Sequence, residues 1–296
     1  MSMSYKKKKI SLFELISFLI LTVIGVVTIF PFYNVLILSL ANHGEAMRRS
    51  VYLLPYSFDL TSIKTILSEP SFLRSVGVSA FVTVVGVLVS MTVTTMGAYA
   101  LSKKSLPGRN LILGMVLFTM FFNGGLIPYY LVLKKIGFVN NLAVMILPAA
   151  VSAFYLIVMK NFFRSIPESL EESARIDGAG DFYILYKIVI PLSTPIIATF
   201  SLFYAVDRWN DWWSALIFIS DQRINPLQIF LREMLVSFNN SMLSAAAASA
   251  MENKRTVYFE GAQMAAVVIS VLPIAVLYPC LQKYFVKGIL VGSVKE

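Results

Sequence analysis

The chain has 296 residues, of which 57% are hydrophobic and 14% charged, and its net charge is +9. Soluble domains carry roughly 25% charged residues, so this composition excludes an ordinary soluble enzyme or a disordered chain and predicts a multi-span membrane protein. The cations are dispersed between apolar runs, which disfavours a nucleic-acid partner. With one cysteine, Cys280, and one histidine, His43, we expect no internal disulfide, no metal site and no catalytic residues.

Six apolar segments are long enough for spanning helices, which need about 20 residues. In chain order they cover 16–40, 73–101, 111–133, 142–162, 192–219 and 262–285. The first follows the lysines of Lys6–Lys9, but it is too long for a signal peptide and no small-residue cleavage site follows it. We therefore expect an all-α polytopic membrane protein. Residues 16–290 would form one transmembrane domain between a basic segment, 1–15, and a tail, 291–296.

The distribution of Lys and Arg predicts that both termini are cytoplasmic. In that orientation 14 of these residues fall on the inner side and 10 on the outer side, and Arg208 lies inside a span. Lys134 and Lys135 run against the assignment locally. Of the three long connections, 41–72 and 220–261 are then external, and 161–191 is cytoplasmic.

The cytoplasmic connection contains a short, well-specified helix. Ser165 and Glu168 have the spacing of a capping box. Glu171 and Arg175 are four residues apart, in the favourable order for an ion pair. Gly178 stands where a left-handed residue would end the helix. Such a helix is either a surface linker or a docking element for a soluble partner.

The sequence around this helix resembles the EAA loop of binding-protein-dependent ABC importer permeases. The matching residues are Glu172-Ser-Ala-Arg-Ile-Asp-Gly-Ala179, then Ile188-Val-Ile-Pro-Leu192 and Pro195. Ser173 replaces the usual alanine, and Ile190 replaces the usual leucine. Three further segments resemble the carbohydrate-uptake branch and its LplC-type members, namely Phe121–Pro128, Phe203–Val206 with Trp209-Asn210, and Tyr278–Gly288. The resemblance therefore covers nearly the whole chain.

This resemblance implies a type I ABC importer permease with six spans, a non-catalytic subunit in the bacterial cytoplasmic (inner) membrane. The implied partners are a second homologous permease, two ATP-binding subunits, an extracellular or periplasmic solute-binding protein, membrane lipid and a carbohydrate. ATP and Mg would bind to the partner subunits, and the chain itself has no Gly-x-x-x-x-Gly-Lys-Ser/Thr phosphate loop. The residues implied to couple to the ATPases are Glu171, Glu172, Ala174, Arg175, Asp177, Gly178 and Ala179.

A polar cluster interrupts the fifth apolar segment and consists of Asp207, Arg208, Trp209, Asn210, Asp211, Trp212 and Trp213. A charge at membrane depth costs at least ~2.5 kcal/mol, so these side chains should face protein or water. In one interpretation Asp207, Arg208 and Asp211 neutralise one another between helices. In the other, the cluster and Asn123 line the pathway of a sugar.

Arg208 gives the second interpretation a more specific form. The related permeases usually have Gly-His before Trp-Asn, whereas this chain has Asp207-Arg208. Arginine pairs bidentately with carboxylates. We therefore expect an acidic, uronate-containing oligosaccharide such as one derived from alginate or pectin. The alternative substrate is a neutral oligosaccharide.

Two other functional classes compete with an importer permease. A stand-alone secondary transporter or channel predicts a path of intramembrane ionisable residues and often an inverted repeat. The sequence contains one intramembrane polar cluster, and we find no repeat in it. A membrane enzyme would need a nucleophile and base or a metal set, for which we find no candidates, so it ranks last.

Overall fold

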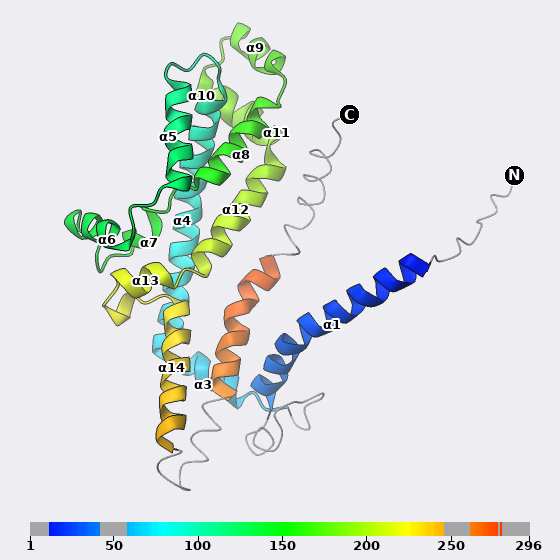
Figure 1. The fold of residues 1–296 in the computed structure, drawn as a ribbon, viewed down its shortest axis with the longest axis vertical. Coiled ribbons are helices and arrows are strands. Elements are labelled where there is room, and N and C mark those ends of the chain that lie inside the picture. The colour runs from blue at the N-terminus through cyan, green and yellow to red at the C-terminus, as the bar shows by residue number, and fades with distance from the viewer. Residues whose placement is uncertain (1–11, 42–57, 246–260, 278, 280–296) are drawn as a thin grey trace, which may run out of the picture. The chain divides into compact units, whose positions relative to one another are not determined.

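The computed structural model describes residues 12–41, 58–245, 261–277 and 279, and their regular structure is entirely helical (Figure 1). The expected all-α fold is therefore confirmed for the described residues. These residues belong to two compact units, one within Met1–Ser68 and Leu235–Ile269, the other within Glu69–Met234 and Ser270–Glu296. Several expected features lie outside the described residues, namely Lys6–Lys9, His43, Cys280, the end of the last span and the tail 291–296.

The first unit contains α1 (Leu12–Leu40), which covers the first expected span as one continuous helix of 29 residues. Most of its side chains are exposed and apolar, as suits contact with lipid or with other helices. α3 (Thr61–Ser68) begins beside the end of α1. The Asp59 N–H donates to the Leu40 carbonyl at 2.9 Å, and Asp59 Oδ1 accepts from the Thr61 N–H at 2.8 Å. This aspartate therefore caps α3.

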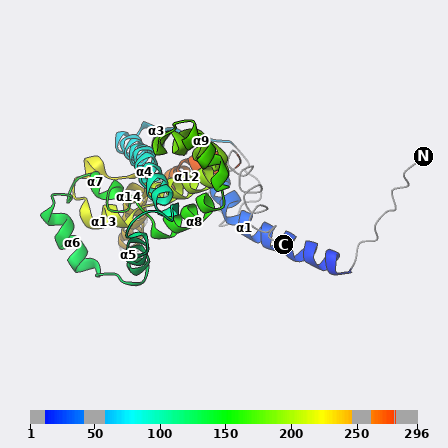
Figure 2. The ribbon, with the colours of Figure 1, turned by 90° about the horizontal axis from the view of Figure 1, so that it is seen from above.

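The second unit is organised around α4 (Pro70–Ser102), a continuous helix of 33 residues. At 1.5 Å per residue its length is about 50 Å, which exceeds the ~30 Å hydrocarbon core of a bilayer. α8 (Ala153–Arg164) and α12 (Thr194–Trp209) pack along it (Figures 1 and 2). Small residues on the buried side of α4 allow this close approach, among them Ser75, Ser79, Gly86, Ser90, Thr94 and Ala98.

The third apolar segment, expected as one helix over 111–133, is two helices in the structure. α5 (Arg109–Phe121) and α6 (Leu126–Lys135) are bent by 119° at the turn between them. Gly125 in this turn has a φ of +84°, which residues with a Cβ adopt only with strain. The glycines that follow Asn123 thus account for the break.

The fourth segment, expected over 142–162, is divided as well. α7 (Ala143–Ile146) is followed by Pro148, and α8 begins only at Ala153. Proline has no N–H and its ring obstructs the preceding turn, so a helix cannot continue through it undisturbed. The backbone carbonyls at the end of α7 therefore need other partners.

The fifth segment, expected over 192–219, is interrupted at both ends of α12. Before α12, the chain bends by 86° at Ser193, and after α12 the helix stops at the polar cluster. The helices on either side are α10 (Asp181–Ile184), the π-helix η1 (Leu185–Val189), α11 (Ile190–Leu192) and α13 (Trp213–Phe218).

The remaining described elements are the 3-10 helix η2 (Gln222–Ile224), α14 (Leu227–Ala245) and the apolar helix Gly261–Leu277. Among the described residues α1 and α4 are each long and apolar enough to cross a membrane, and up to four crossings result if each bent pair counts as one. The expected number of six spans stays a prediction.

Two hydrophobic clusters hold the second unit together. One surrounds the C-terminal end of α4, where Tyr99 packs with Met159 of α8, with η1 and with Phe200 of α12. The other surrounds Val82 of α4 and includes side chains of α6, α7, α13 and α14. Both clusters thus join α4 to segments where the chain bends.

Candidate functional site

The helix predicted in the cytoplasmic connection is α9 (Glu168–Ile176). Its end is as predicted, because Gly178 has a φ of +85°. The Gly178 N–H donates to the Arg175 carbonyl at 3.0 Å, and the Ala179 N–H donates to the Ala174 carbonyl at 2.9 Å. These two bonds form a Schellman motif, in which a glycine ends the helix at little steric cost. The predicted left-handed conformation of Gly178 is confirmed.

The start of α9 differs from the prediction. Ser165 is the C-cap of α8, and its hydroxyl donates to the Phe162 carbonyl at 2.7 Å. The N-cap of α9 is Pro167, which provides no side-chain cap. The predicted capping box between Ser165 and Glu168 is therefore wrong, because the serine side chain is engaged in ending the preceding helix.

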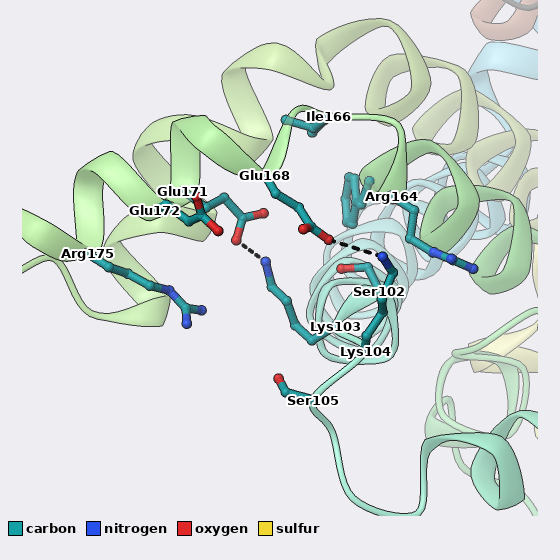
Figure 3. A pocket seen from close by; sticks show the side chains of 11 residues that line it. Ser102, Lys103, Lys104, Ser105, Arg164, Ile166, Glu168, Glu171, Glu172 and Arg175 are labelled. Carbon is teal, nitrogen blue, oxygen red and sulfur yellow. Dashed lines mark hydrogen bonds and ion pairs between the residues drawn. The ribbon is translucent and has the colours of Figure 1, made fainter.

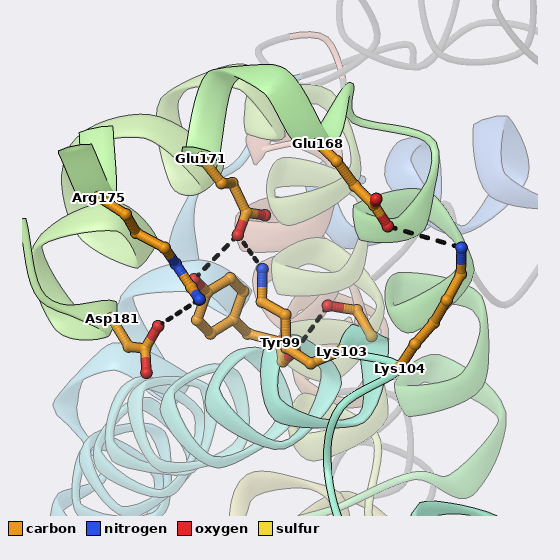
Figure 4. A network of polar contacts seen from close by, with 8 residues as sticks. Tyr99, Lys103, Lys104, Glu168, Glu171, Arg175 and Asp181 are labelled. Carbon is orange, nitrogen blue, oxygen red and sulfur yellow. Dashed lines mark hydrogen bonds and ion pairs between the residues drawn. The ribbon is translucent and has the colours of Figure 1, made fainter. Parts of the chain in front are cut away.

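The predicted ion pair between Glu171 and Arg175 is also wrong, because each side chain has another partner (Figure 4). Glu171 pairs with Lys103, which directly follows α4, and Tyr99 Oη donates to the same carboxylate at 3.4 Å. Arg175 Nη2 pairs with Asp181 Oδ1 of α10 at 2.7 Å. Packing of α9 against the end of α4 brings Lys103 close enough to replace the helical neighbour.

Lys103 and Tyr99 are the residues that sequence reasoning missed. The Lys103 ammonium also lies 4.2 Å from the centroid of the Tyr99 ring, within the range of a cation–π contact. The partners Lys103 and Glu171 are 68 residues apart in the sequence, so no local pattern joins them. The available signal was a pair of lysines at the end of an apolar helix and an acidic helix expected on the same side of the membrane.

These side chains line a polar cleft of about 380 Å³ between the end of α4, the end of α8 and the start of α9 (Figure 3). The cleft carries both signs of charge, contributed by Lys103, Lys104, Arg164, Arg175, Glu168, Glu171 and Glu172. Ala174 and Ala179 pack inward against the cluster around Tyr99. Glu172 and Asp177 are exposed, and so is Ile176, whose side chain is 85% accessible. α9 thus has one face fixed to the protein and one face free for a partner.

The polar cluster of the fifth segment has a buried part, centred on Arg208. This side chain is 5% exposed. Its guanidinium donates to the carbonyls of Met145 at 2.6 Å and Ile146 at 3.2 Å, to the Ala149 carbonyl, and to Ser90 Oγ at 3.3 Å. The first three are the carbonyls left without helical partners beside Pro148. Arg208 thus supplies hydrogen bonds to the backbone carbonyls that the break in the fourth segment leaves without helical partners.

One of the two interpretations, in which Asp207, Arg208 and Asp211 pair directly with one another, does not match the contacts in the structure. Asp207 accepts a hydrogen bond from Tyr155 Oη at 3.1 Å, and Asp211 Oδ1 accepts from the Ser214 N–H at 3.1 Å at the start of α13. No ion pair joins Arg208 to either aspartate within the described part of the chain. Arg208 donates instead to the backbone carbonyls near Pro148, because helix packing brings these carbonyls, and not the two carboxylates, to its buried donors.

The tryptophans of the cluster are likewise divided between a buried part and an exposed part. Trp209 is buried, and its Nε1 donates to the Ser270 carbonyl at 3.0 Å. Trp212 and Trp213 are 41% and 53% exposed and meet edge to face with ring centroids 5.5 Å apart. The guanidinium of Arg232, on α14, lies 5.7 Å from the Trp212 ring centroid. Sequence reasoning missed this exposed arginine.

The two amides proposed for the pathway lie in different places. Asn210 is exposed at the end of α12, and its Oδ1 accepts from Gln228 Nε2 of α14 at 3.4 Å. Asn123 lies in the turn between α5 and α6, where its Oδ1 accepts from the Gly125 N–H at 2.9 Å. None of the hydrogen bonds within the described ranges joins Asn123 to the polar cluster. No group of three or more His, Cys, Asp or Glu that could hold a metal occurs there either.

The fold and the site together define an integral membrane protein of the permease class. It has apolar helices of span length, bent helix pairs, and a buried arginine that donates hydrogen bonds to the backbone of a broken span. The chain belongs to the family described as the inner membrane component of binding-protein-dependent transport systems, whose sequence profile matches residues 105–291. It is therefore an inner-membrane transport subunit of an ABC transporter, with the type I permease fold. The resemblance inferred from the EAA-like motif is confirmed.

Two relatives from Bacillus subtilis cover almost the whole chain. Protein LplC is 44% identical over 283 residues, which are 96% of this chain and 95% of that protein. The polygalacturonan/rhamnogalacturonan transport system permease protein YtcP is 40% identical over 96% of this chain and 98% of its own length. Among solved structures, a bacterial ABC transporter involved in the import of the acidic polysaccharide alginate has a chain 31% identical to this one. The TM-score is 0.83, with 96% of this chain and 100% of that chain covered.

Proposed function

We propose that the chain is a permease subunit of an ATP-driven importer for acidic, uronate-containing oligosaccharides or polysaccharides. The observation that carries the proposal is its similarity, over 96% of its length, to a polygalacturonan/rhamnogalacturonan permease and to an alginate importer. A neutral oligosaccharide is the second candidate, favoured by the arabinooligosaccharide permease AraQ of Halalkalibacterium halodurans, which is 26% identical over 92% of this chain.

The exposed part of the polar cluster supports a sugar pathway. Trp212 and Trp213 offer ring faces for the apolar faces of sugars, and Asp207 and Asn210 offer hydrogen-bond partners for hydroxyl groups. Both Nη atoms of the buried Arg208 donate to protein oxygens, and its Nε has no partner among the described residues. The acidic-substrate proposal therefore no longer rests on Arg208. Arg232, beside Trp212, has the exposed guanidinium that a uronate carboxylate requires.

We propose that α9 docks onto an ATP-binding subunit and couples ATP hydrolysis to transport. Its free face combines the exposed Ile176 with the carboxylates of Glu172 and Asp177. An apolar anchor with polar groups around it is typical of a protein interface. Two ATP-binding subunits would hold ATP and Mg, a second homologous permease would complete the pathway, and an extracellular solute-binding protein would deliver the sugar.

Uptake by the reconstituted complex tests this function. The chain is purified with its co-expressed second permease and ATPase subunits, inserted in vesicles and supplied with the binding protein. Oligogalacturonides and neutral oligosaccharides of equal length serve as labelled substrates. ATP-dependent uptake of the acidic sugar alone is expected. Preference for the neutral sugar would overturn the acidic substrate, and ATP-independent uptake by the chain alone would favour a stand-alone transporter.

A further inference from the structure

We propose that α9 and α4 move as one rigid unit. In this proposal the brace formed by Tyr99, Lys103 and Glu171 transmits movement of α9 through α4 to α12. The inference rests on the proposed docking of α9 to an ATPase. It assigns a positioning role to Lys103 and Tyr99 and makes Glu171 an internal contact rather than a contact to the partner.

The brace is formed where water has limited access. The side chains of Lys103 and Glu171 are 24% and 14% exposed, and Tyr99 contacts both through its hydroxyl and its ring. Ion pairs gain strength as solvent is excluded. The neighbouring pair, Lys104 with Glu168, is 3.7 Å long, with side chains 71% and 77% exposed, and exposed pairs of this kind contribute little. The brace at Lys103 and the weak exposed pair at Lys104 therefore lie side by side, and the second can serve as a control for the first (Figure 4).

The same helix that carries Tyr99 and precedes Lys103 contacts the polar cluster further along. Ser90 Oγ accepts from Arg208, and Thr94 Oγ1 lies 2.9 Å from Tyr204 Oη in a buried hydrogen bond. From Ser90 to Lys103 the rise along a helix is about 20 Å. The C-terminal half of α4 therefore links the polar cleft beside α9 with α12 of the interrupted fifth segment.

The covalent route from α9 to α12 is less direct. It passes through the left-handed Gly178, the π-helix η1 and the 86° bend at Ser193. π-Helical turns and bends between short elements are places where a chain adjusts its backbone. Backbone adjustments along this route would reduce the displacement that reaches α12 when α9 moves. The brace, in contrast, connects α9 directly to α4.

Charge exchange tests the brace, since proximity alone does not establish coupling. Lys103→Glu, Glu171→Lys and the double exchange are compared in the reconstituted complex, with Lys104→Glu as a control that makes the same charge change one residue away. Each single variant is expected to lower the sugar transported per ATP hydrolysed about tenfold, and the double exchange to recover most of it. Assembly with the ATPases, measured by co-purification, should be unchanged.

Two results would overturn the brace: Lys103→Glu behaving like Lys104→Glu, or a double exchange no better than the single variants. If the wild-type complex itself fails to assemble or to import, the proposed function fails instead, so the two failures are distinguishable. Tyr99→Phe, which keeps the ring and removes the hydroxyl, provides a milder variant should charge reversal impair folding. It should lower the transport-to-hydrolysis ratio about twofold to threefold, and an unchanged ratio would count against the brace.

A cross-link distinguishes a rigid unit from a pivot. Cysteines replace Lys103 and Glu171 in a Cys280→Ser background, and a short bifunctional maleimide joins them. If α9 and α4 move together, the cross-linked complex is expected to transport better than the same variant left unlinked. Loss of transport on cross-linking, with retained ATPase activity, would show that α9 must move relative to α4 and would overturn the proposal.

Discussion

Arg208 of α12 donates a hydrogen bond to the Met145 carbonyl of α7 at 2.6 Å, so a charge in the fifth apolar segment satisfies the backbone of the fourth. Backbone groups at membrane depth must find partners within the protein. Pro148 prevents the helix from supplying them. The arginine is therefore better explained by the interruption of α7 than by a substrate carboxylate.

Replacing Arg208 by Met should destabilise the permease and abolish transport of acidic and neutral sugars alike. The change leaves the buried carbonyls of Met145 and Ile146 unpaired, each at a cost of about 1–3 kcal/mol. Thermal unfolding of the purified complex measures this loss. The exposed Asp207, changed to Asn, provides the control, which should retain the melting temperature. A stable Arg208→Met variant that fails only with acidic sugars would show that Arg208 recognises the substrate after all.

Gly86→Ala should lower stability by about 1–3 kcal/mol, the usual cost of overpacking. A Cβ at Gly86 would lie 3.2–3.3 Å from Nε, Cδ and Cγ of Arg208, whose buried position leaves it little room to move. Gly77→Ala is the matched control in the same helix, because nothing lies within 4 Å of its Cβ position. It should be neutral or stabilising, since alanine is the better helix former. Equal melting temperatures for the two variants would contradict this account of Gly86.

Tyr204→Phe should be more costly than Thr94→Val. The Tyr204 hydroxyl bonds with Thr94 Oγ1 at 2.9 Å and accepts from the Ser152 N–H at 3.0 Å. Removing it leaves a backbone donor at the start of α8 unpaired, which costs about 1–3 kcal/mol. Thr94→Val leaves the bond to Ser152 in place. Denaturation of both purified variants tests the order, and a reversed order would contradict the assignment.

Gly178→Ala should reduce transport while leaving the core of the second unit intact. With a φ of +85°, the alanine would be strained by about 1–2 kcal/mol although nothing crowds its Cβ. The strain would shift the end of α9 and hence its free face. Gly180→Ala, where φ is −77° and space is also open, is the control and should transport normally. A normal rate for Gly178→Ala would mean that this turn does not position α9.

Arg232→Gln should lower uptake of oligogalacturonide about tenfold, the loss expected for one charge-assisted hydrogen bond, and leave uptake of neutral sugar unchanged. The side chain is exposed beside Trp212, so the fold should tolerate the change. Arg223→Gln is a suitable control, because its partner is Asp221, two residues earlier, at 2.9 Å. Equal effects on both sugars would assign Arg232 a structural role.

The sequence predicts the features that depend on neighbouring residues. The uninterrupted apolar run of α4 and the left-handed Gly178 follow from periodicity and local backbone sterics. The partners of Lys103 and Arg208 could not be predicted, because they are set by helix packing between residues far apart. In addition, the acceptors of Arg208 are backbone carbonyls near Pro148, which every residue has, so no residue type in the sequence marks them. The break at Gly125 had a local signal in the two glycines that follow Asn123, although the span was expected to continue over 111–133.

The 119° bend between α5 and α6 changes how the surface charges should be counted. At about 15 Å in length, α6 is too short to cross the ~30 Å hydrocarbon core by itself. Lys134 and Lys135 lie exposed in its last turn, and long cationic side chains at such a position extend to the membrane interface. The two lysines that oppose the topology from charge bias would then anchor α6 at the interface, and they would carry no weight in deciding which side of the membrane is inside.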